Sequence, residues 1–166
     1  MPSLSVDATA PIWSDATGPF WKGLDLAVQP QASSQCVRTC LAIITGADPE
    51  RFAGVNTQDP GSWSDALAPF EMALAYCPTD VRKVVHYIPG LLALDDLFLL
   101  GYYLGQGFLS EPTEDGWLAA SHLIVIYGDE VLDPMGFRVA LKDHDCGGQH
   151  CKRLFRVVPA GYHRTI

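Results

Sequence analysis

Two cysteines four residues apart, Cys36 and Cys40, open the first apolar segment of the chain, in the run QCVRTCLAII. Ser33 or Ser34 can cap a helix there, which puts Cys36 in its first turn. Free backbone N–H groups and the positive end of the helix dipole favour a thiolate at that position, and the thiolate is the nucleophilic form. Cys36 is therefore the candidate nucleophile, and Cys40, one turn deeper, is better placed for packing. The alternative is that both are small buried hydrophobic residues.

A histidine and an aspartate, His122 and Asp133, stand at the same end of a predicted hairpin. The segment 121–128, SHLIVIYG, predicts a strand, and 130–132 predicts its antiparallel partner after a short turn. A cysteine nucleophile needs a general base, and the base needs an orienting group, which are roles that imidazole and carboxylate fill. Taken singly, His122 suits a structural histidine and Asp133 a turn residue. Together with Cys36, in this order, they predict a catalytic triad.

The elements that must position these residues follow from hydrophobic spacing and turn signals. Val37, Leu41 and Ile44 recur at helical spacing and form one apolar stripe. The sequence predicts helices at about 34–44, 65–76 and 91–104, and strands at about 81–87, 105–110, 121–128, 130–132, 137–141 and 154–158. Helices that precede an antiparallel sheet form an α+β layout.

Length and composition indicate one globular domain. The chain has 166 residues, of which 48% are hydrophobic and 18% charged, and a domain of this size can bury a core without disulfides or metals. Residues 1–30 are rich in Pro, Ser, Asp and Trp with little periodicity, which predicts an irregular N-terminal segment. We therefore expect a single domain over residues 1–166.

Charge and apolar runs restrict the partners that we expect. Eleven basic and nineteen acidic residues give a net charge of −8, which disfavours nucleic acid and an anionic membrane surface as partners. No stretch reaches the roughly 18 apolar residues of a membrane span. The first 20 residues lack the basic start and apolar run of a signal peptide. With five cysteines, we expect reduced thiols and a cytoplasmic location.

These residues resemble a papain-like-fold cysteine peptidase and are most similar to the bacterial double-glycine leader peptidases that process bacteriocins. In that branch the nucleophile appears in a pattern like C-G-x-A-C-L-A-M. Here the run is CVRTCLAI, with Val37 and Thr39 in place of the small residues. The family histidine begins a strand, as His122 does in HLIVIYG, and the family aspartate precedes a proline, as Asp133 does in EVLDP. The resemblance spans roughly residues 29–140.

The resemblance implies a papain-like α+β fold, in which N-terminal helices carry the nucleophile and pack on a C-terminal antiparallel sheet. It implies a bacterial or phage thiol hydrolase that cleaves a peptide or related amide bond through the Cys–His–Asp triad and a thioester, without a cofactor. Deamidation and acyl transfer use the same machinery. The family also places a glutamine several residues before the nucleophile as oxyanion donor. Gln31 lies five and Gln29 seven residues before Cys36, so both are candidates.

Two other functions stay open. The absent glycine after Cys36 and the irregular glutamine spacing favour a non-catalytic papain-like module that binds a peptide or protein partner. The cluster DHDCGGQHC, 143–151, favours a small zinc-binding protein organised by residues 144–151. Its spacing matches no usual zinc finger or ribbon, so a polar loop between two strands is the simpler interpretation. A local disulfide between Cys146 and Cys151 is a further alternative, and we assign no metal ligand.

Overall fold

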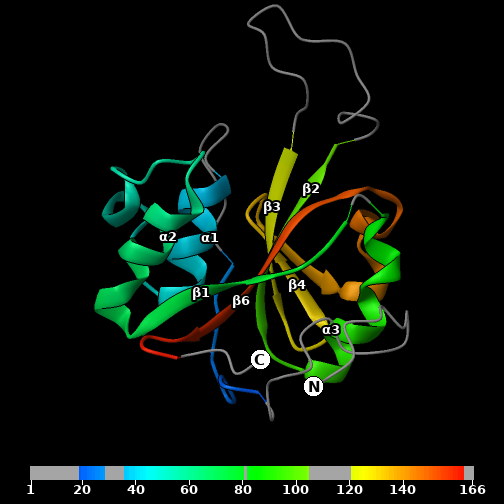
Figure 1. Ribbon diagram of the computed structural model, residues 1–166, viewed down its shortest axis with the longest axis horizontal. Coiled ribbons are helices and arrows are strands. Elements are labelled where there is room, and N and C mark those ends of the chain that lie inside the picture. The colour runs from blue at the N-terminus through cyan, green and yellow to red at the C-terminus, as the bar shows by residue number, and fades with distance from the viewer. Residues whose placement is uncertain (1–18, 29–35, 81, 105–120, 163–166) are drawn as a thin grey trace, which may run out of the picture.

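An antiparallel sheet lies at the centre of the part of the chain that the structure describes, residues 19–28, 36–80, 82–104 and 121–162 of a computed structural model (Figure 1). Its strands are β1 (Met72–Cys77), β2 (Leu97–Tyr103), β3 (Ser121–Tyr127), β4 (Glu130–Asp133), β5 (Phe137–Ala140) and β6 (Cys151–Pro159). Within these residues the six strands lie in the order β1-β6-β2-β3-β4-β5, and neighbours are antiparallel. The predicted α+β class is confirmed at this level.

Helices cover both faces of the sheet. The α-helices are α1 (Cys36–Thr45), α2 (Pro60–Leu67) and α3 (Ile88–Leu94), and the 3-10 helices are η1 (Pro49–Phe52), η2 (Ala68–Phe70), η3 (Val84–His86), η5 (Leu141–Asp143) and η6 (Asp145–Gly148). Figure 1 shows α1 and α2 on one side of the sheet and α3 on the other. None of the helices in the described ranges combines the length and apolar character needed to cross a membrane.

The sheet separates two apolar clusters, and alternate residues of β2 point into each of them. Leu97 and Leu99 are buried in the cluster that contains α1 and α2. Phe98 and Leu100 are buried in the cluster that contains α3. Since successive side chains of a strand point to opposite faces, a strand covered on both sides is apolar throughout. This accounts for the unbroken apolar run of β2.

The hairpin that was predicted to carry the histidine and the aspartate is present. β3 and β4 pair antiparallel with Val125 opposite Leu132 and Tyr127 opposite Glu130. Gly128 turns the chain at a φ of +63, a left-handed conformation that glycine adopts without strain. The predicted strands at 137–141 and 154–158 are confirmed as β5 and as part of β6. The predicted helix at 34–44 is confirmed as α1 from residue 36 onward, since residues 34 and 35 lie outside the described ranges.

Two predicted helices were wrong because each of them runs across a chain reversal. The predicted helix at 65–76 is divided between α2, the 3-10 helix η2 and β1, and Glu71 makes the reversal at a φ of 62. The predicted helix at 91–104 is divided between α3 and β2, and Asp95 makes the reversal at a φ of 50. Two strands therefore precede the C-terminal part of the sheet, and the helices do not all come first.

The predicted strand at 81–87 was also wrong, and the segment instead contains the 3-10 helix η3. Pro89 lies in the first turn of α3, where its missing N–H is no loss, so the chain turns into a helix directly after Tyr87. Residue 81, the predicted strand at 105–110 and residues 1–18 of the predicted irregular segment lie outside the described ranges.

Candidate active site

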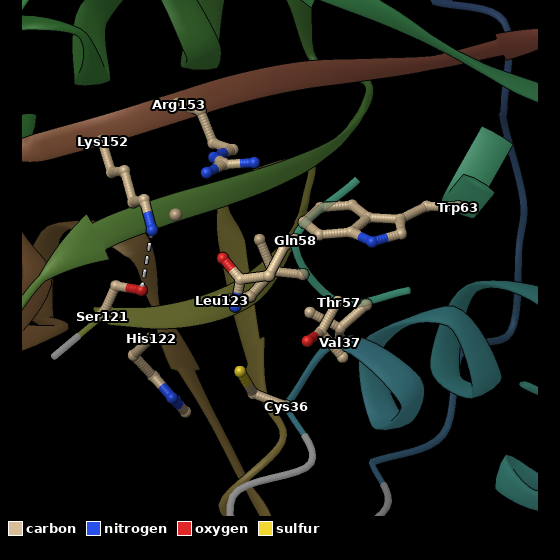
Figure 2. A pocket seen from close by; sticks show the side chains of 11 residues that line it. Cys36, Val37, Thr57, Gln58, Trp63, Ser121, His122, Leu123, Lys152 and Arg153 are labelled. Atoms are coloured by element: carbon tan, nitrogen blue, oxygen red, sulfur yellow. Dashed lines mark hydrogen bonds between the residues drawn. The ribbon is translucent and has the colours of Figure 1, made fainter. Parts of the chain in front are cut away.

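Cys36 lies at the start of α1, next to His122 on β3. The apolar stripe of α1 packs Leu41 and Ile44 into the core cluster that also holds Leu123 and Val125 of β3. This packing fixes the first turn of α1 against the first residues of β3. Figure 2 shows the Cys36 thiol and the His122 ring side by side at one end of these elements.

His122 connects Cys36 to Asp133. Its Nε2 lies 2.8 Å from Asp133 Oδ1, and its ring lies beside the Cys36 thiol, close enough for each group to shift the pKa of the other. Since Nε2 is engaged by the carboxylate, Nδ1 is the nitrogen that can receive the thiol proton. The three residues that the sequence predicted as catalytic are therefore in contact, in the order thiol, imidazole, carboxylate.

The pKa values of this pair favour the thiolate and the imidazolium. Burial raises the pKa of Cys36, but hydrogen bonds from His122 and the backbone of Leu123, together with the charge of His122, outweigh it and lower that pKa below its usual value. Burial lowers the pKa of His122, but the hydrogen bonds to Asp133 and Cys36 outweigh it and raise that pKa to about 9. Both shifts move the proton from sulfur to the ring.

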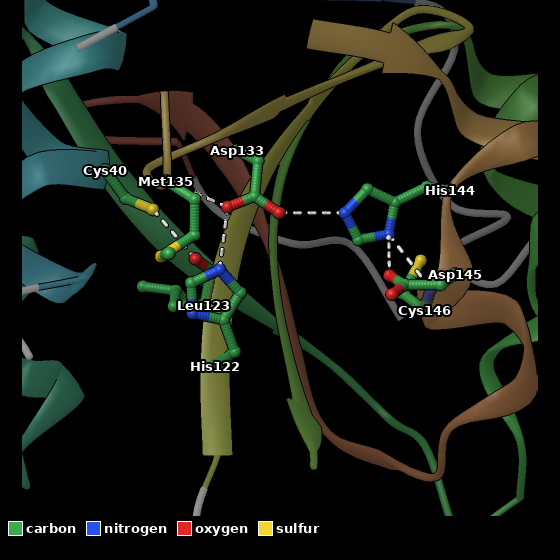
Figure 3. A network of polar contacts seen from close by, with 8 residues as sticks. All are labelled: Cys40, His122, Leu123, Asp133, Met135, His144, Asp145 and Cys146. Carbon is green, nitrogen blue, oxygen red and sulfur yellow. Dashed lines mark hydrogen bonds and ion pairs between the residues drawn. The ribbon is translucent and has the colours of Figure 1, made fainter. Parts of the chain in front are cut away.

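A second histidine, His144, binds the other oxygen of the same carboxylate (Figure 3). Its Nε2 lies 2.8 Å from Asp133 Oδ2, and its Nδ1 accepts the backbone N–H of Cys146 at 2.9 Å. Because Nδ1 is an acceptor, Nε2 must carry the hydrogen and donate it to Asp133. Asp145 also lies 3.4 Å from Nδ1, but an ion pair there requires a proton on Nδ1. The backbone contact is shorter, and the Asp145 side chain is 89% exposed, so we assign the neutral tautomer.

Asp133 is thus a buried carboxylate held by several donors. Burial raises its pKa, but the hydrogen bonds from His122, His144 and the backbone N–H of Met135 outweigh it and lower that pKa below its usual value. Asp133 therefore stays ionised at neutral pH and can stabilise an imidazolium at His122. The sequence did not predict that His144 belongs to this network.

Cys40 differs from Cys36 in its surroundings. It is fully buried, and its Sγ donates to the carbonyl oxygen of Leu123 at 3.2 Å. Burial raises the pKa of Cys40 well above its usual value, so this thiol stays protonated. The structure places Cys40 in the core as a packing residue, one turn inside the helix that presents Cys36.

The predicted cluster at 143–151 is organised around Asp133 and the core. His144 binds Asp133, while Cys146 and Cys151 are buried in the cluster on the α3 side of the sheet. All five cysteines are free thiols, so no disulfide joins Cys146 to Cys151. Over the described ranges, no group of three or more His, Cys, Asp or Glu side chains is arranged to hold a metal ion. The geometry gives the zinc alternative no support.

A pocket of about 180 Å³ opens beside the Cys36 thiol. Figure 2 shows it between the start of α1, the strand β6 and the indole of Trp63. Its lining residues are Cys36, Val37, Thr57, Gln58, Trp63, Gly101, Ser121, His122, Leu123, Lys152 and Arg153. The two glutamines that the resemblance suggested as oxyanion donors, Gln29 and Gln31, lie outside the described ranges. The pocket is large enough to admit part of a substrate to the thiol and the imidazole.

No protein-family model and no curated protein sequence matches this chain. The candidate site is thus defined by its own geometry: Cys36 lies beside His122, which is hydrogen-bonded to Asp133, at the edge of a pocket.

The lowered pKa of Cys36 predicts the pH dependence of its alkylation. Because only the thiolate reacts, the rate at Cys36 is expected to level off at a lower pH than the rate of an ordinary thiol, whose pKa is near 9. In the His122→Ala variant Cys36 stays buried but loses the main group that stabilises its thiolate. The midpoint of the curve of rate against pH should therefore move above 9. Mass spectrometry gives the rate of iodoacetamide incorporation at each pH. A series from about pH 5 to about 10 spans the ordinary thiol pKa and gives the midpoint of the rate curve for both proteins. Equal midpoints in the two proteins would contradict the assigned pair.

Proposed function

We propose that this protein is a thiol hydrolase of papain-like fold that cleaves a peptide or related amide bond. The observation that supports the proposal is the linked arrangement of Cys36, His122 and Asp133 beside a pocket. A helix that presents the nucleophile and an antiparallel sheet that presents the base and the carboxylate are the arrangement that the resemblance implies. The free thiols fit a reducing compartment such as the cytoplasm.

The proposed reaction proceeds by acyl transfer through a thioester. His122 takes the proton of Cys36, and the thiolate attacks the substrate carbonyl carbon, which places negative charge on the carbonyl oxygen. The backbone N–H of Cys36 and the amide of Gln29 or Gln31 are the proposed donors to this oxyanion. The imidazolium of His122 then protonates the leaving amine as the C–N bond breaks. Water, deprotonated by the same ring, attacks the thioester and releases the carboxylic acid and the thiol.

Asp133 has a supporting role in this sequence of steps. It accepts a hydrogen bond from Nε2 of His122 and so keeps Nδ1 directed at the sulfur. Its charge also stabilises the imidazolium that exists between attack and departure of the amine. The same steps give deamidation when ammonia is the leaving group, and acyl transfer when an amine replaces water. The proposal therefore specifies the reaction at the carbonyl carbon but not the identity of the substrate.

Alkylation by iodoacetamide tests the proposed nucleophile without a known substrate. At pH 7 we expect Cys36 to react faster than the free thiol of glutathione and ahead of the other four cysteines, which are buried. The His122→Ala variant should lose this selective reaction because the buried thiol loses the partner that favours its ionised form. Peptide mass spectrometry after short exposure identifies the modified cysteine.

The Cys40→Ala variant is the matched control, because it removes the neighbouring thiol and leaves the contacts of Cys36 with His122 in place. Its Cys36 should still react rapidly. Reaction of wild-type Cys36 no faster than glutathione would contradict the enzyme proposal and favour the non-catalytic binding module instead.

A further inference from the structure

Two cationic side chains, Lys152 and Arg153, line the same pocket as the candidate nucleophile. Both belong to β6, and Figure 2 shows both extending from that strand toward the space above Cys36. The chain as a whole has a net charge of −8, so two adjacent cations in its pocket are not a consequence of overall composition. They give the wall opposite Cys36 a local positive charge.

A β-bulge explains how two consecutive residues of one strand reach one pocket. Successive residues of a regular strand point to opposite faces of the sheet. Between β6 and β2, however, Arg153 pairs with Gly101 while Cys151 pairs with Tyr102, so Lys152 is an extra residue with no partner in the ladder. A bulge of this kind redirects side chains and is common beside active sites. Here it turns Lys152 and Arg153 toward the same side.

Gly101 makes room for the arginine on the facing strand. A Cβ atom at Gly101 would lie 3.3 Å from Cγ of Arg153 and 3.7 Å from Cδ1 of Leu123. The first of these distances is shorter than most contacts of a Cβ atom, and the second is an ordinary van der Waals contact. The absence of a side chain lets the stem of Arg153 lie flat across β2. Its guanidinium then lies 5.8 Å from the centre of the Trp63 ring on the pocket wall.

Neither cation is neutralised by a carboxylate in the described part of the chain. Lys152 Nζ donates to Ser121 Oγ at 3.3 Å, and Arg153 lies over the aromatic ring of Trp63. The ion pairs among the described residues involve other cations: Arg38, Arg82, His122, Arg138, His144 and Arg156. Two half-buried cations that share a pocket repel one another, and an anionic ligand would relieve that repulsion.

We propose that Lys152 and Arg153 bind a carboxylate of the substrate next to the carbonyl that Cys36 attacks. This inference rests on the proposed function, and it names the substrate class as amides that carry a carboxylate close to the reacting bond. Arg153 offers the planar fork of donors that fits a carboxylate, and Lys152 adds a point charge beside it. Trp63 and Leu123 supply the apolar part of the pocket for the uncharged portion of the substrate.

The rates of alkylation of Cys36 by iodoacetate and by iodoacetamide test the proposal. The two reagents transfer similar groups to sulfur with loss of iodide, and only iodoacetate carries a carboxylate. The ratio of the two rates therefore measures preference for an anion and corrects for general changes in the reactivity of Cys36. We expect Lys152→Gln and Arg153→Gln each to lower this ratio by roughly threefold to tenfold at low ionic strength, and added salt to lower it in the wild-type protein.

Two variants separate charge in the pocket from charge elsewhere. Lys142→Gln removes one positive charge at an exposed position outside the pocket lining and should leave the ratio unchanged. Arg153→Lys keeps the charge and should retain most of the preference, whereas Arg153→Gln should not. If Arg153→Gln does not fold, as judged by circular dichroism, Lys152→Gln at the unpaired bulge position decides the question.

An unchanged ratio in the folded Lys152→Gln variant and in the Lys152→Gln/Arg153→Gln double variant would overturn the proposal. That outcome differs from failure of the proposed function. If Cys36 is not selectively reactive toward iodoacetamide in the wild-type protein, the thiol hydrolase itself is contradicted. If Cys36 is reactive but shows no dependence on the two cations, only the carboxylate inference is lost.

Discussion

Replacing Asp133 with asparagine is expected to slow the alkylation of Cys36 at pH 7 by roughly 100-fold. Oδ1 of the carboxylate accepts hydrogen bonds from His122 and from the backbone N–H of Met135, and Oδ2 accepts one from His144. Asparagine offers one oxygen and one NH2 group to these two rings, and His144 can only donate because its Nδ1 accepts the N–H of Cys146. If the amide oxygen takes the position facing His144, the NH2 group faces His122 and the Met135 N–H; if the oxygen keeps His122 and Met135, the NH2 group faces the His144 donor, so neither orientation satisfies all three groups.

The orientation that places the NH2 group toward His122 forces this ring into the wrong tautomer. Its Nε2 must accept from the new amide, so the hydrogen moves to Nδ1, the nitrogen that faces the Cys36 thiol. In that tautomer Nδ1 already carries a hydrogen and cannot take the thiol proton, and in either orientation no carboxylate remains to stabilise an imidazolium. The pKa of His122, now about 9, should fall, and the pKa of Cys36 should rise because its burial remains.

The variant Asp129→Asn is the matched control for this prediction. Asp129 lies in the exposed turn between β3 and β4, so the substitution removes the same charge from the same hairpin without touching the rings. Its alkylation rate should stay within about twofold of the wild-type rate, since surface charges at a distance are screened. Titration of His122 by NMR gives a second readout, in which only Asp133→Asn should show a markedly lower pKa. Wild-type alkylation in Asp133→Asn would mean that the carboxylate does not orient the base.

The sequence predicted that His122 and Asp133 lie together because their placement depends on local features. The alternation of apolar residues and the glycine turn set the register of the β3–β4 hairpin, and that register alone brings positions 122 and 133 together. His144 could not be found in this way. It reaches Asp133 only after β5 has returned along β4 and η5 has redirected the chain, with the His144 N–H bound to the carbonyl of Ala140. Nothing in the segment 143–151 encodes that path locally.

The pocket cations illustrate the same limit. Lys152 and Arg153 are adjacent in the sequence, and a regular strand would direct them to opposite faces. Their common direction depends on the register shift between β6 and β2, two strands that are separated by about 50 residues, from Tyr102 to Cys151. A pairing irregularity between distant segments leaves no pattern within either segment.

The boundary between α3 and β2 shows why the fold was predicted only in part. The run 91–104 is apolar except at Asp95 and Asp96, because β2 is buried on both faces and α3 on one. Periodicity cannot distinguish a buried helix from a doubly covered strand. The reversal at Asp95, which has a left-handed φ of 50, divides the two elements, and aspartate is one of the few residues other than glycine that tolerate it.

Replacing Asp96 with asparagine is expected to lower the free energy of unfolding by about 3 kcal/mol or more, because it leaves a buried guanidinium without its carboxylate. Asp96 and Arg156 are both 0% exposed, and Oδ2 of Asp96 lies 2.8 Å from Nε and 2.7 Å from Nη2 of Arg156. The carboxylate also accepts the backbone N–H groups of Phe20 and Trp21. An amide oxygen can retain some of these donors, but its NH2 group would face other donors.

The neighbouring Asp95→Asn variant tests whether this effect belongs to the buried pair, since both substitutions exchange the same side chains at consecutive positions. Asp95 is exposed, and asparagine tolerates its left-handed φ, so its cost should stay within about 0.5 kcal/mol. Urea unfolding followed by tryptophan fluorescence gives both free energies. Equal free energies of unfolding for the two variants would contradict the predicted cost of leaving Arg156 without its carboxylate. A large loss of unfolding free energy in Asp96→Asn alone would also increase partial unfolding, which exposes the buried thiols. Iodoacetamide would then begin to modify Cys40 and Cys77, and its selectivity for Cys36 would fall.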